Sequence, residues 1–356
     1  MIVYFLLYML ILLGTPILTN SGRTLERKRE KSTIYITLLV ILVVGLRHPS
    51  MGWDLQYQKP YGYFWSFENI AQLPLRDVIQ KTSWLNYEWG YILYNKLLGY
   101  VSTNESWLLF ASASLSFVPI GIMIGRHSKD PVFSWIVYLG LPCFLIPFSG
   151  LRQAIAIGIV CLSFLYIQQR KLIKFVIVIW IASLFHSSAM IVLIAYPLYR
   201  MKLKPKIRMW SIPALAVVFI LRRPLFLIAS RLFKDNVRVD DTHAFTLLLV
   251  FVLIYLFCCV FMKNDDEEAA GFLNLFYFAC ICQAFGGLNQ LAIRVGYYFM
   301  PPLAIALPGI VKNMTINNYK ISRPVLISIF AIYGLYALYT SSWPMAYPYH
   351  FFWSEL

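Results

Sequence analysis

Six ionisable side chains stand at the ends of long apolar stretches or directly beside them. They are Arg47, Asp54, Glu88, Arg152, His186 and Arg294. A charge near the bilayer interior costs roughly 3 kcal/mol on insertion scales, so residues of this kind usually line a cavity or take part in chemistry. Because arginines bind anions while carboxylates and histidine accept protons, the set suggests anion binding combined with proton transfer.

The three arginines occupy positions that suit a phosphate. Arg152 lies in PFSGLRQAIAIG, where Ser149 and Gly150 predict a break followed by a helix start. A helix N-terminus offers free backbone N–H groups, and an arginine adds a fixed fork of donors, a pairing that fits phosphate or pyrophosphate. Arg294 begins a further apolar run and Arg47 ends one, so the same reasoning applies to both. The alternative for each is an interfacial arginine that reaches lipid headgroups.

Three residues are candidates for a base. His186 lies in LFHSSAM, at a turn between two apolar stretches, and histidine has the intrinsic pKa to accept a proton near neutrality. Asp54 and Glu88 are embedded in the aromatic sequences GWDLQY and YEWGY. A carboxylate there could deprotonate or orient a sugar hydroxyl, since tryptophan and tyrosine faces stack on sugar rings. The alternatives are a hydrogen-bonded core histidine and carboxylates paired to a nearby arginine, and the sequence does not choose among the three.

The elements that must position these residues are membrane helices. Of the 356 residues, 60% are hydrophobic and only 13% are charged. Apolar runs of spanning length recur along the chain, which predicts an all-α polytopic membrane protein with about twelve transmembrane helices in a single domain, 1–356. Several of the runs are short, as expected of spans inside a bundle or of broken helices. The predicted spans are 2–19, 32–46, 105–125, 131–149, 153–168, 172–185, 187–199, 209–221, 244–262, 270–288, 295–311 and 323–340.

Loop charge predicts the orientation of these spans. The loop SGRTLERKREKS and the segment 200–208 each carry five basic residues, which places them in the cytoplasm. Strict alternation then puts both termini and all six candidate residues at the outer face. The outer segments are 47–104 and 222–243. The first contains a predicted re-entrant or interfacial segment near 55–103, and the second is amphipathic and basic, suited to a membrane surface.

Other functional classes fit the sequence poorly. The net charge of +15 follows from loop lysines and arginines, so nucleic acid is not an expected partner. The six cysteines lie in apolar runs without disulfide or zinc spacing. No P-loop, HExxH motif or acidic metal cage is present, so we expect neither a metal nor a cofactor.

The motifs, taken in order, resemble a known family. GLRHPSMGWDLQY occurs at 45–57, ExGY at 88–91, SGLRQ at 149–153 and FHSSA at 185–189, followed by Arg294 with Tyr298 and the tail PYHFFW. This set is similar to the EpsG-like branch of Wzy-type polysaccharide polymerases, which make O-antigen, capsule or exopolysaccharide.

The resemblance implies a fold, an activity and a set of site residues. It implies a GT-C-like, metal-independent inverting glycosyltransferase of the bacterial inner membrane, with its site at the periplasmic face. Its substrates would be undecaprenyl-pyrophosphate-linked oligosaccharides, and its partners membrane lipids and a chain-length regulator. Transferred to this chain, the family pattern implies pyrophosphate binding by Arg152, Arg294 and Arg47, catalysis by Asp54, Glu88 or His186, and substrate binding by Tyr57, Gln153, Tyr91 and Tyr298.

Two alternatives stay open. A flippase or other transporter of lipid-linked oligosaccharide would place its charges along a central path, whereas here they are predicted at one face. An O-antigen ligase would perform the same chemistry on lipid A core as acceptor, and usually carries one large outer loop in place of the two moderate ones predicted here.

Overall fold

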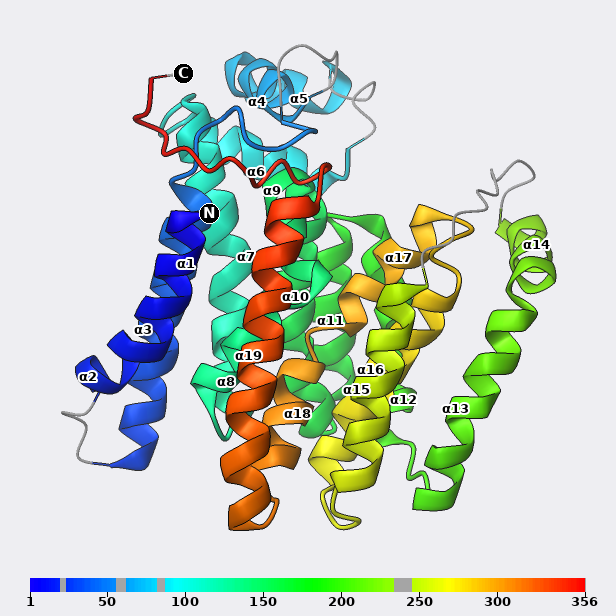
Figure 1. Cartoon of the computed structure of the whole chain (residues 1–356). Coiled ribbons are helices and arrows are strands. Elements are labelled where there is room, and N and C mark those ends of the chain that lie inside the picture. The colour runs from blue at the N-terminus through cyan, green and yellow to red at the C-terminus, as the bar shows by residue number, and fades with distance from the viewer. Residues whose placement is uncertain (20–23, 56–61, 82–86, 234–244, 356) are drawn as a thin grey trace. The chain divides into compact units, whose positions relative to one another are not determined.

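The computed structural model describes residues 1–19, 24–55, 62–81, 87–233 and 245–355, with side chains except at 19, 79–81 and 229–233. Within these ranges every regular element is a helix (Figure 1). A lone antiparallel bridge joins Arg47 to Phe351. The predicted all-α class is therefore confirmed for the part of the chain that is described.

The chain divides into two compact units, 1–190 with 324–356, and 191–323. Whether both act as the single predicted domain stays a prediction. The first unit contains α1 (Ile2–Met9), a π-helix (Leu10–Gly14), α2 (Thr15–Thr19), α3 (Leu25–Gly45), α4 (Tyr63–Gln72), α5 (Leu75–Lys81), α6 (Trp89–Gly99), α7 (Glu105–His127), α8 (Pro131–Leu139), a 3-10 turn (Pro142–Leu145), α9 (Ile146–Ser149), α10 (Leu151–Gln168) and α11 (Leu172–Ser183).

The remaining helices follow in the chain from Ser187 onward, and most of them belong to the second unit. The last of them, α19, returns to the first unit at Pro324. They are a 3-10 helix (Ser187–Ile194), α12 (Ala195–Arg200), α13 (Pro205–Ile220), α14 (Arg222–Phe233), α15 (Thr246–Phe261), α16 (Glu267–Ala284), α17 (Gln290–Gly296), a 3-10 turn (Tyr297–Phe299), α18 (Leu303–Lys312) and α19 (Ile316–Thr340).

Three of the described helices, α7, α10 and α19, are long and apolar enough to cross a membrane. Three bent pairs raise the number to six if each pair forms one span, and the helical stretches Ile2–Leu18, Leu172–Ser183 and Thr246–Phe261 are apolar but shorter. These helices are those of a polytopic membrane protein. Twelve spans remain a prediction.

Prolines explain where predicted spans are bent. The run 131–149 turns by 71° between α8 and Pro142–Ser149, because Pro142 lacks an N–H and holds Leu141 in an extended conformation. The run 295–311 lies in a helix pair that bends by 47° around Pro301 and Pro302.

In the first unit α7 packs against both α3 and α10, and α10 packs against α11. A Cβ on Gly158 of α10 would lie 2.4 Å from the Ser116 carbonyl oxygen of α7, so a residue without a side chain is needed there. The closely packed α7–α10 pair provides a rigid support for the start of α10.

The C-terminal tail lies at the same end of the first unit as α4, α5 and α6 (Figure 1). Its backbone is bonded to the residues that follow α3: His48 N–H donates to the His350 carbonyl at 2.8 Å, and Phe352 N–H donates to the Leu46 carbonyl at 2.9 Å. The tail therefore fixes the loop that begins the predicted outer segment 47–104. That segment forms only short helices in its described part, and its re-entrant or interfacial character stays a prediction.

In the second unit α16 packs against α12, α13, α15, α17 and α18. The other predicted outer segment, 222–243, begins with α14, and its residues 234–243 lie outside the described part of the chain.

Candidate functional site

Arg152 lies in the first turn of α10, as the sequence predicts. The short helix α9 ends at Ser149, and Gly150 precedes α10 without a side chain that could cap it. The first N–H groups of a helix have no partner within the helix, so this start carries free donors and a positive partial charge.

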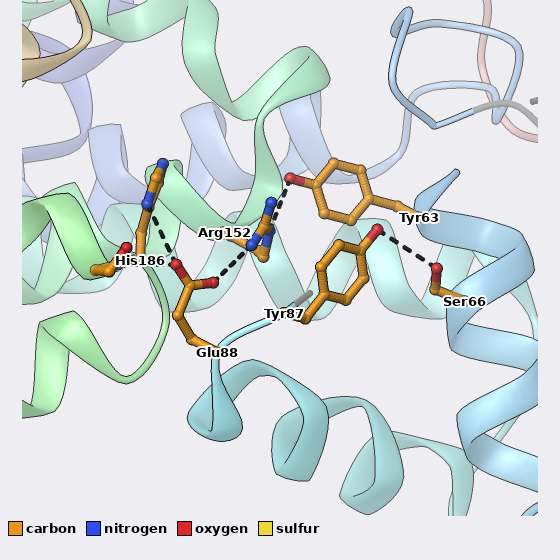
Figure 2. Close-up of polar contacts among 7 residues, drawn as sticks. Tyr63, Ser66, Tyr87, Glu88, Arg152 and His186 are labelled. Atoms are coloured by element: carbon orange, nitrogen blue, oxygen red, sulfur yellow. Dashed lines mark hydrogen bonds and ion pairs between the residues drawn. The ribbon is translucent and has the colours of Figure 1, made fainter. Parts of the chain in front are cut away.

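The Arg152 guanidinium is held on three sides (Figure 2). Its Nη1 donates to Glu88 Oε2 at 2.6 Å, its Nε donates to the Tyr63 hydroxyl at 3.4 Å, and its plane lies over the Tyr87 ring at 4.3 Å from the centroid. A guanidinium has five N–H donors, and the two bonds leave three of them for a ligand. The side chain is 23% exposed, so a ligand can reach it.

Glu88 connects Arg152 to the turn that contains His186. It stands immediately before α6, and its Oε1 accepts from the Ser187 N–H at 2.8 Å and lies 3.5 Å from His186 Nδ1 (Figure 2). The contact with His186 is at the outer limit of a hydrogen bond, so the bonds from Arg152 and Ser187 hold the carboxylate more firmly.

Gly90 allows α6 to approach this turn. A Cβ at position 90 would lie 2.6 Å from the Leu184 carbonyl oxygen, and the same oxygen accepts from the Tyr91 N–H at 3.2 Å. The glycine of the ExGY motif therefore has a physical reason: it lets the segment of Glu88 lie against the segment of His186.

The environment keeps Glu88 ionised. Burial alone would raise the pKa of Glu88, but the contacts from His186 and the Ser187 N–H, together with the charge of Arg152, lower this pKa to about 2. Burial beside Tyr63 raises the pKa of Tyr87 to about 12, so Tyr87 faces Arg152 as a neutral phenol at neutral pH. The cluster thus combines a fixed carboxylate with a guanidinium and an imidazole.

Aromatic rings line this cluster. Tyr63 and Tyr87 are stacked with centroids 5.9 Å apart, and Tyr91 meets both of them edge-on. Tyr91, a predicted substrate-binding residue, is fully buried, and its hydroxyl has no hydrogen-bond partner among the described residues. In this structure it packs beneath the cluster.

Arg47 makes contacts of a different kind. It is fully buried after α3, and its guanidinium donates to the Val44, Pro147 and Phe148 carbonyl oxygens. Burial lowers the pKa of Arg47 to about 10, so it remains charged at neutral pH. These contacts fasten the end of α3 to the segment before Arg152, and pyrophosphate binding by Arg47 stays a prediction.

Asp54 lies near Tyr63 and Tyr87, the two tyrosines that contact Arg152. Its carbonyl oxygen accepts from the Tyr63 N–H at 3.1 Å, and its charge acts on Tyr87. Gln153, which follows Arg152, is buried. Tyr57 lies outside the described residues.

Arg294 and Tyr298 belong to the second unit. The expectation that Arg294 begins a span is wrong, because α17 already begins at Gln290 and Arg294 lies in its last turn. The Asn289 side chain caps this earlier start by accepting from the Leu291 N–H at 2.7 Å. Tyr298 is buried in the 3-10 turn that follows.

Sequence reasoning missed Tyr63, Tyr87 and Ser187, which all contact the charged residues. Tyr87 directly precedes Glu88 and Ser187 directly follows His186, so their positions beside two candidates were a usable signal. No comparable signal marks Tyr63. Among the described residues, no group of three or more His, Cys, Asp or Glu is placed to hold a metal ion.

These features define a polytopic helical membrane protein with a cluster of arginine, glutamate and histidine beside the start of α10. The chain belongs to the EpsG family, whose model matches residues 32–351. Comparisons with curated proteins and with solved structures find no match. Membership of this family places the protein in the general class of glycosyltransferase-like exopolysaccharide polymerases.

Proposed function

We propose that the protein polymerises lipid-linked oligosaccharide repeat units. It transfers the growing glycan from undecaprenyl pyrophosphate to the non-reducing end of another repeat unit. The observation that supports this most directly is the Arg152 guanidinium at the uncapped start of α10, held by a carboxylate that also approaches His186. The family supplies the class of reaction, and the cluster supplies the groups that the reaction needs.

Arg152 binds the leaving group in this proposal. As the bond between the donor sugar C1 and the pyrophosphate oxygen breaks, negative charge grows on the pyrophosphate. The remaining guanidinium donors and the free N–H groups of α10 stabilise that charge, and one well-placed contact of this kind is worth roughly 3–4 kcal/mol. No step requires a metal ion.

His186 accepts the proton of the acceptor hydroxyl. The hydroxyl oxygen forms a bond to C1 on the face opposite the leaving pyrophosphate, which inverts the anomeric configuration. Glu88 is a weak base because its pKa is about 2, so we assign it the role of orienting His186 and Arg152. With Nδ1 turned toward Glu88, the Nε2 of His186 presents its lone pair for the proton. Asp54 is the second candidate for the base.

The proposal includes the finer features that the sequence predicts. These are about twelve spans in a GT-C-like arrangement, a bacterial inner membrane location, an active site at the periplasmic face, and contributions from Arg294 to the pyrophosphate site. Tyr57, Gln153, Tyr91 and Tyr298 are the proposed substrate-binding residues, and a chain-length regulator is the proposed protein partner.

Reconstitution tests the reaction. Purified protein in proteoliposomes is given an undecaprenyl-pyrophosphate-linked repeat unit, and the products are separated by gel and identified by mass spectrometry. We expect a ladder of longer glycans together with free undecaprenyl pyrophosphate. Movement of the substrate across the membrane without new glycosidic bonds would indicate a transporter, and transfer only to lipid A core would indicate a ligase; either result overturns the proposal.

The assignment of the base is tested in the same assay. General-base catalysis contributes about 10²–10⁴-fold, so His186→Gln should lower kcat by that factor while Asp54→Asn lowers it less. The opposite order would transfer the role to Asp54.

The location of the site is tested by labelling. Trp53 is exposed beside Asp54, so Trp53→Cys should react with a membrane-impermeant maleimide added to the periplasmic side. Lys204→Cys, in the predicted cytoplasmic segment 200–208, serves as the control that reacts only after permeabilisation. The reverse pattern would overturn the orientation.

A further inference from the structure

The second unit contains a buried arginine that the proposed reaction does not use. Segment 200–208 carries five basic residues, and four of them are exposed. The fifth, Arg208, is only 4% exposed. Of the exposed four, Lys202 pairs with Glu267 at 2.6 Å on the surface. A solvated basic loop explains the four exposed residues but does not explain Arg208.

The hydroxyl groups near Arg208 form hydrogen bonds with groups other than its guanidinium. Ser211 Oγ donates to the Arg208 carbonyl at 2.6 Å, so the Tyr255 hydroxyl, 3.0 Å away, donates to Ser211 Oγ. The Tyr277 hydroxyl donates to the Ser211 carbonyl at 2.6 Å. These bonds tie α13 to α15 and α16 and hold the turn of Arg208 in place. The charge of Arg208 acts on Tyr255 and Cys259, which places the guanidinium against this wall.

None of the described residues gives the Arg208 guanidinium an anionic partner. Within the described part of the chain, Arg208 Nε has no hydrogen-bond acceptor and no carboxylate forms an ion pair with the side chain. A buried cation without a counter-charge is strongly unfavourable, whereas a buried cation bonded to an anion is tolerated. The partner of this cation is therefore expected to lie outside the described residues.

The start of α13, one turn before Arg208, carries free backbone donors. Lys204 precedes the helix without a side-chain cap, and Arg208 N–H is the first to bond within the helix, to the Lys204 carbonyl at 3.0 Å. Because Pro205 has no N–H, the backbone donors of Lys206 and Ile207 remain for a ligand. Free N–H groups beside an arginine fork match the oxygens of a phosphate group.

We propose that Arg208 and the start of α13 form a phosphate-binding site. A lipid headgroup and inorganic phosphate share this chemistry. The surroundings favour the lipid, because Trp210 is 72% exposed and Ile207 is 53% exposed, as expected of side chains at the depth of the headgroups. The site is independent of the proposed glycosyl transfer.

Stabilisation of the delipidated protein tests the proposal. The full chain is purified in a maltoside detergent, and its unfolding temperature is measured with added phosphatidylglycerol, with a galactosyl diacylglycerol of the same acyl chains, or with sodium phosphate against sodium chloride. Phosphatidylglycerol should raise Tm by about 2–4 °C, while the phosphate-free lipid has a smaller effect. A rise with sodium phosphate alone would identify free phosphate as the ligand.

Two matched variants separate the site from general surface charge. Arg208→Gln and Arg200→Gln remove the same guanidinium charge from one basic segment, one buried and one exposed. We expect the phosphate-dependent rise in Tm to disappear in Arg208→Gln and to persist in Arg200→Gln. Equal losses in both variants, or equal stabilisation of the unaltered protein by the two lipids, would overturn the proposal. If Arg208→Gln does not fold, Arg208→Lys and the comparison of the two lipids on the unaltered protein still decide the question.

Discussion

Arg152 Nη1 lies 2.6 Å from Glu88 Oε2, although 64 residues separate the two in the chain. The same carboxylate accepts from the Ser187 N–H and approaches His186. The Glu88 carboxylate therefore lies between an arginine and the Ser187 N–H. A phosphate oxygen would take the same kind of position. Glu88 orients the guanidinium of Arg152 and the imidazole of His186, and in the proposed reaction it is also a fixed negative charge that an arriving pyrophosphate meets.

The first prediction concerns the fork of Arg152. Arg152→Ala should lower kcat by about 10²–10³-fold, because it removes one electrostatic contact to the leaving group. Arg152→Lys keeps the charge but loses the fork and the stacking on Tyr87, so it should also fail to restore normal activity. Glycan chain length in cells and kcat in proteoliposomes measure the effect, with membrane insertion checked by detergent extraction. Full activity of the lysine variant would show that charge alone suffices.

The second prediction separates two roles of Glu88. If the Glu88 carboxylate competes with the pyrophosphate for Arg152, Glu88→Gln should bind inorganic pyrophosphate roughly tenfold more tightly, a change of about 1.4 kcal/mol. The kcat of the same variant should fall, because His186 and Arg152 lose their orientation. Isothermal titration and the kinetic assay measure the two effects.

Glu26→Gln, an exposed substitution of the same chemistry, is the matched control. Weaker pyrophosphate binding in Glu88→Gln would mean that the carboxylate only holds Arg152 in place and does not compete.

The third prediction concerns pH. The pKa of Glu88 is about 2 in the folded protein against an ordinary value of 4.5. A lowered carboxylate pKa stabilises the fold above the ordinary value, and this contribution is lost as the pH falls from about 4.5 toward about 2. The difference in Tm between the unaltered protein and Glu88→Gln should therefore not shrink between pH 8 and pH 5, and should shrink below about pH 4.5. A decrease around neutral pH would contradict the assignment.

Sequence patterns predicted the local settings of several candidate residues. The break at Ser149 and Gly150 correctly indicated the start of α10, the turn at His186 lies between two helices, and Arg47 lies just past Leu46, the C-cap residue of α3. These features depend on helix-breaking residues and on apolar runs, which act locally.

The contacts between segments could not be predicted in the same way. Nothing in the sequence specifies that Glu88 pairs with Arg152, that Tyr63 accepts from it, or that Arg47 bonds to carbonyl groups, because these contacts arise from packing. Arg294 differs from the prediction for a local reason: the Asn289 side chain caps the helix at Gln290, ahead of the apolar run that begins at 295.

The fourth prediction uses the close approach of α6 to the turn of His186. Gly90→Ala places a Cβ only 2.6 Å from the Leu184 carbonyl oxygen, so α6 must shift away and Glu88 must separate from His186. We expect activity to fall by at least roughly tenfold, the cost of even a small misplacement of catalytic groups. Gly309→Ala is the matched control, because a Cβ there meets nothing within 4 Å. Unchanged activity of Gly90→Ala would show that this approach does not matter for the site.

The fifth prediction tests whether Arg47 supports the fold or holds substrate. Its guanidinium donates hydrogen bonds to the buried carbonyl oxygens of Val44, Pro147 and Phe148. Leaving a buried acceptor without a partner costs roughly 1–3 kcal/mol. Arg47→Gln should therefore lower Tm by several degrees or prevent folding, and Arg47→Lys should lower it less, because an ammonium group can reach only some of these acceptors. If Arg47 held the pyrophosphate instead, Arg47→Lys would keep the Tm of the unaltered protein and raise KM for the lipid-linked donor. Thermal unfolding and kinetics of the lysine variant, measured on the same preparation, therefore distinguish a residue that fastens α3 to the segment before Arg152 from one that binds the substrate.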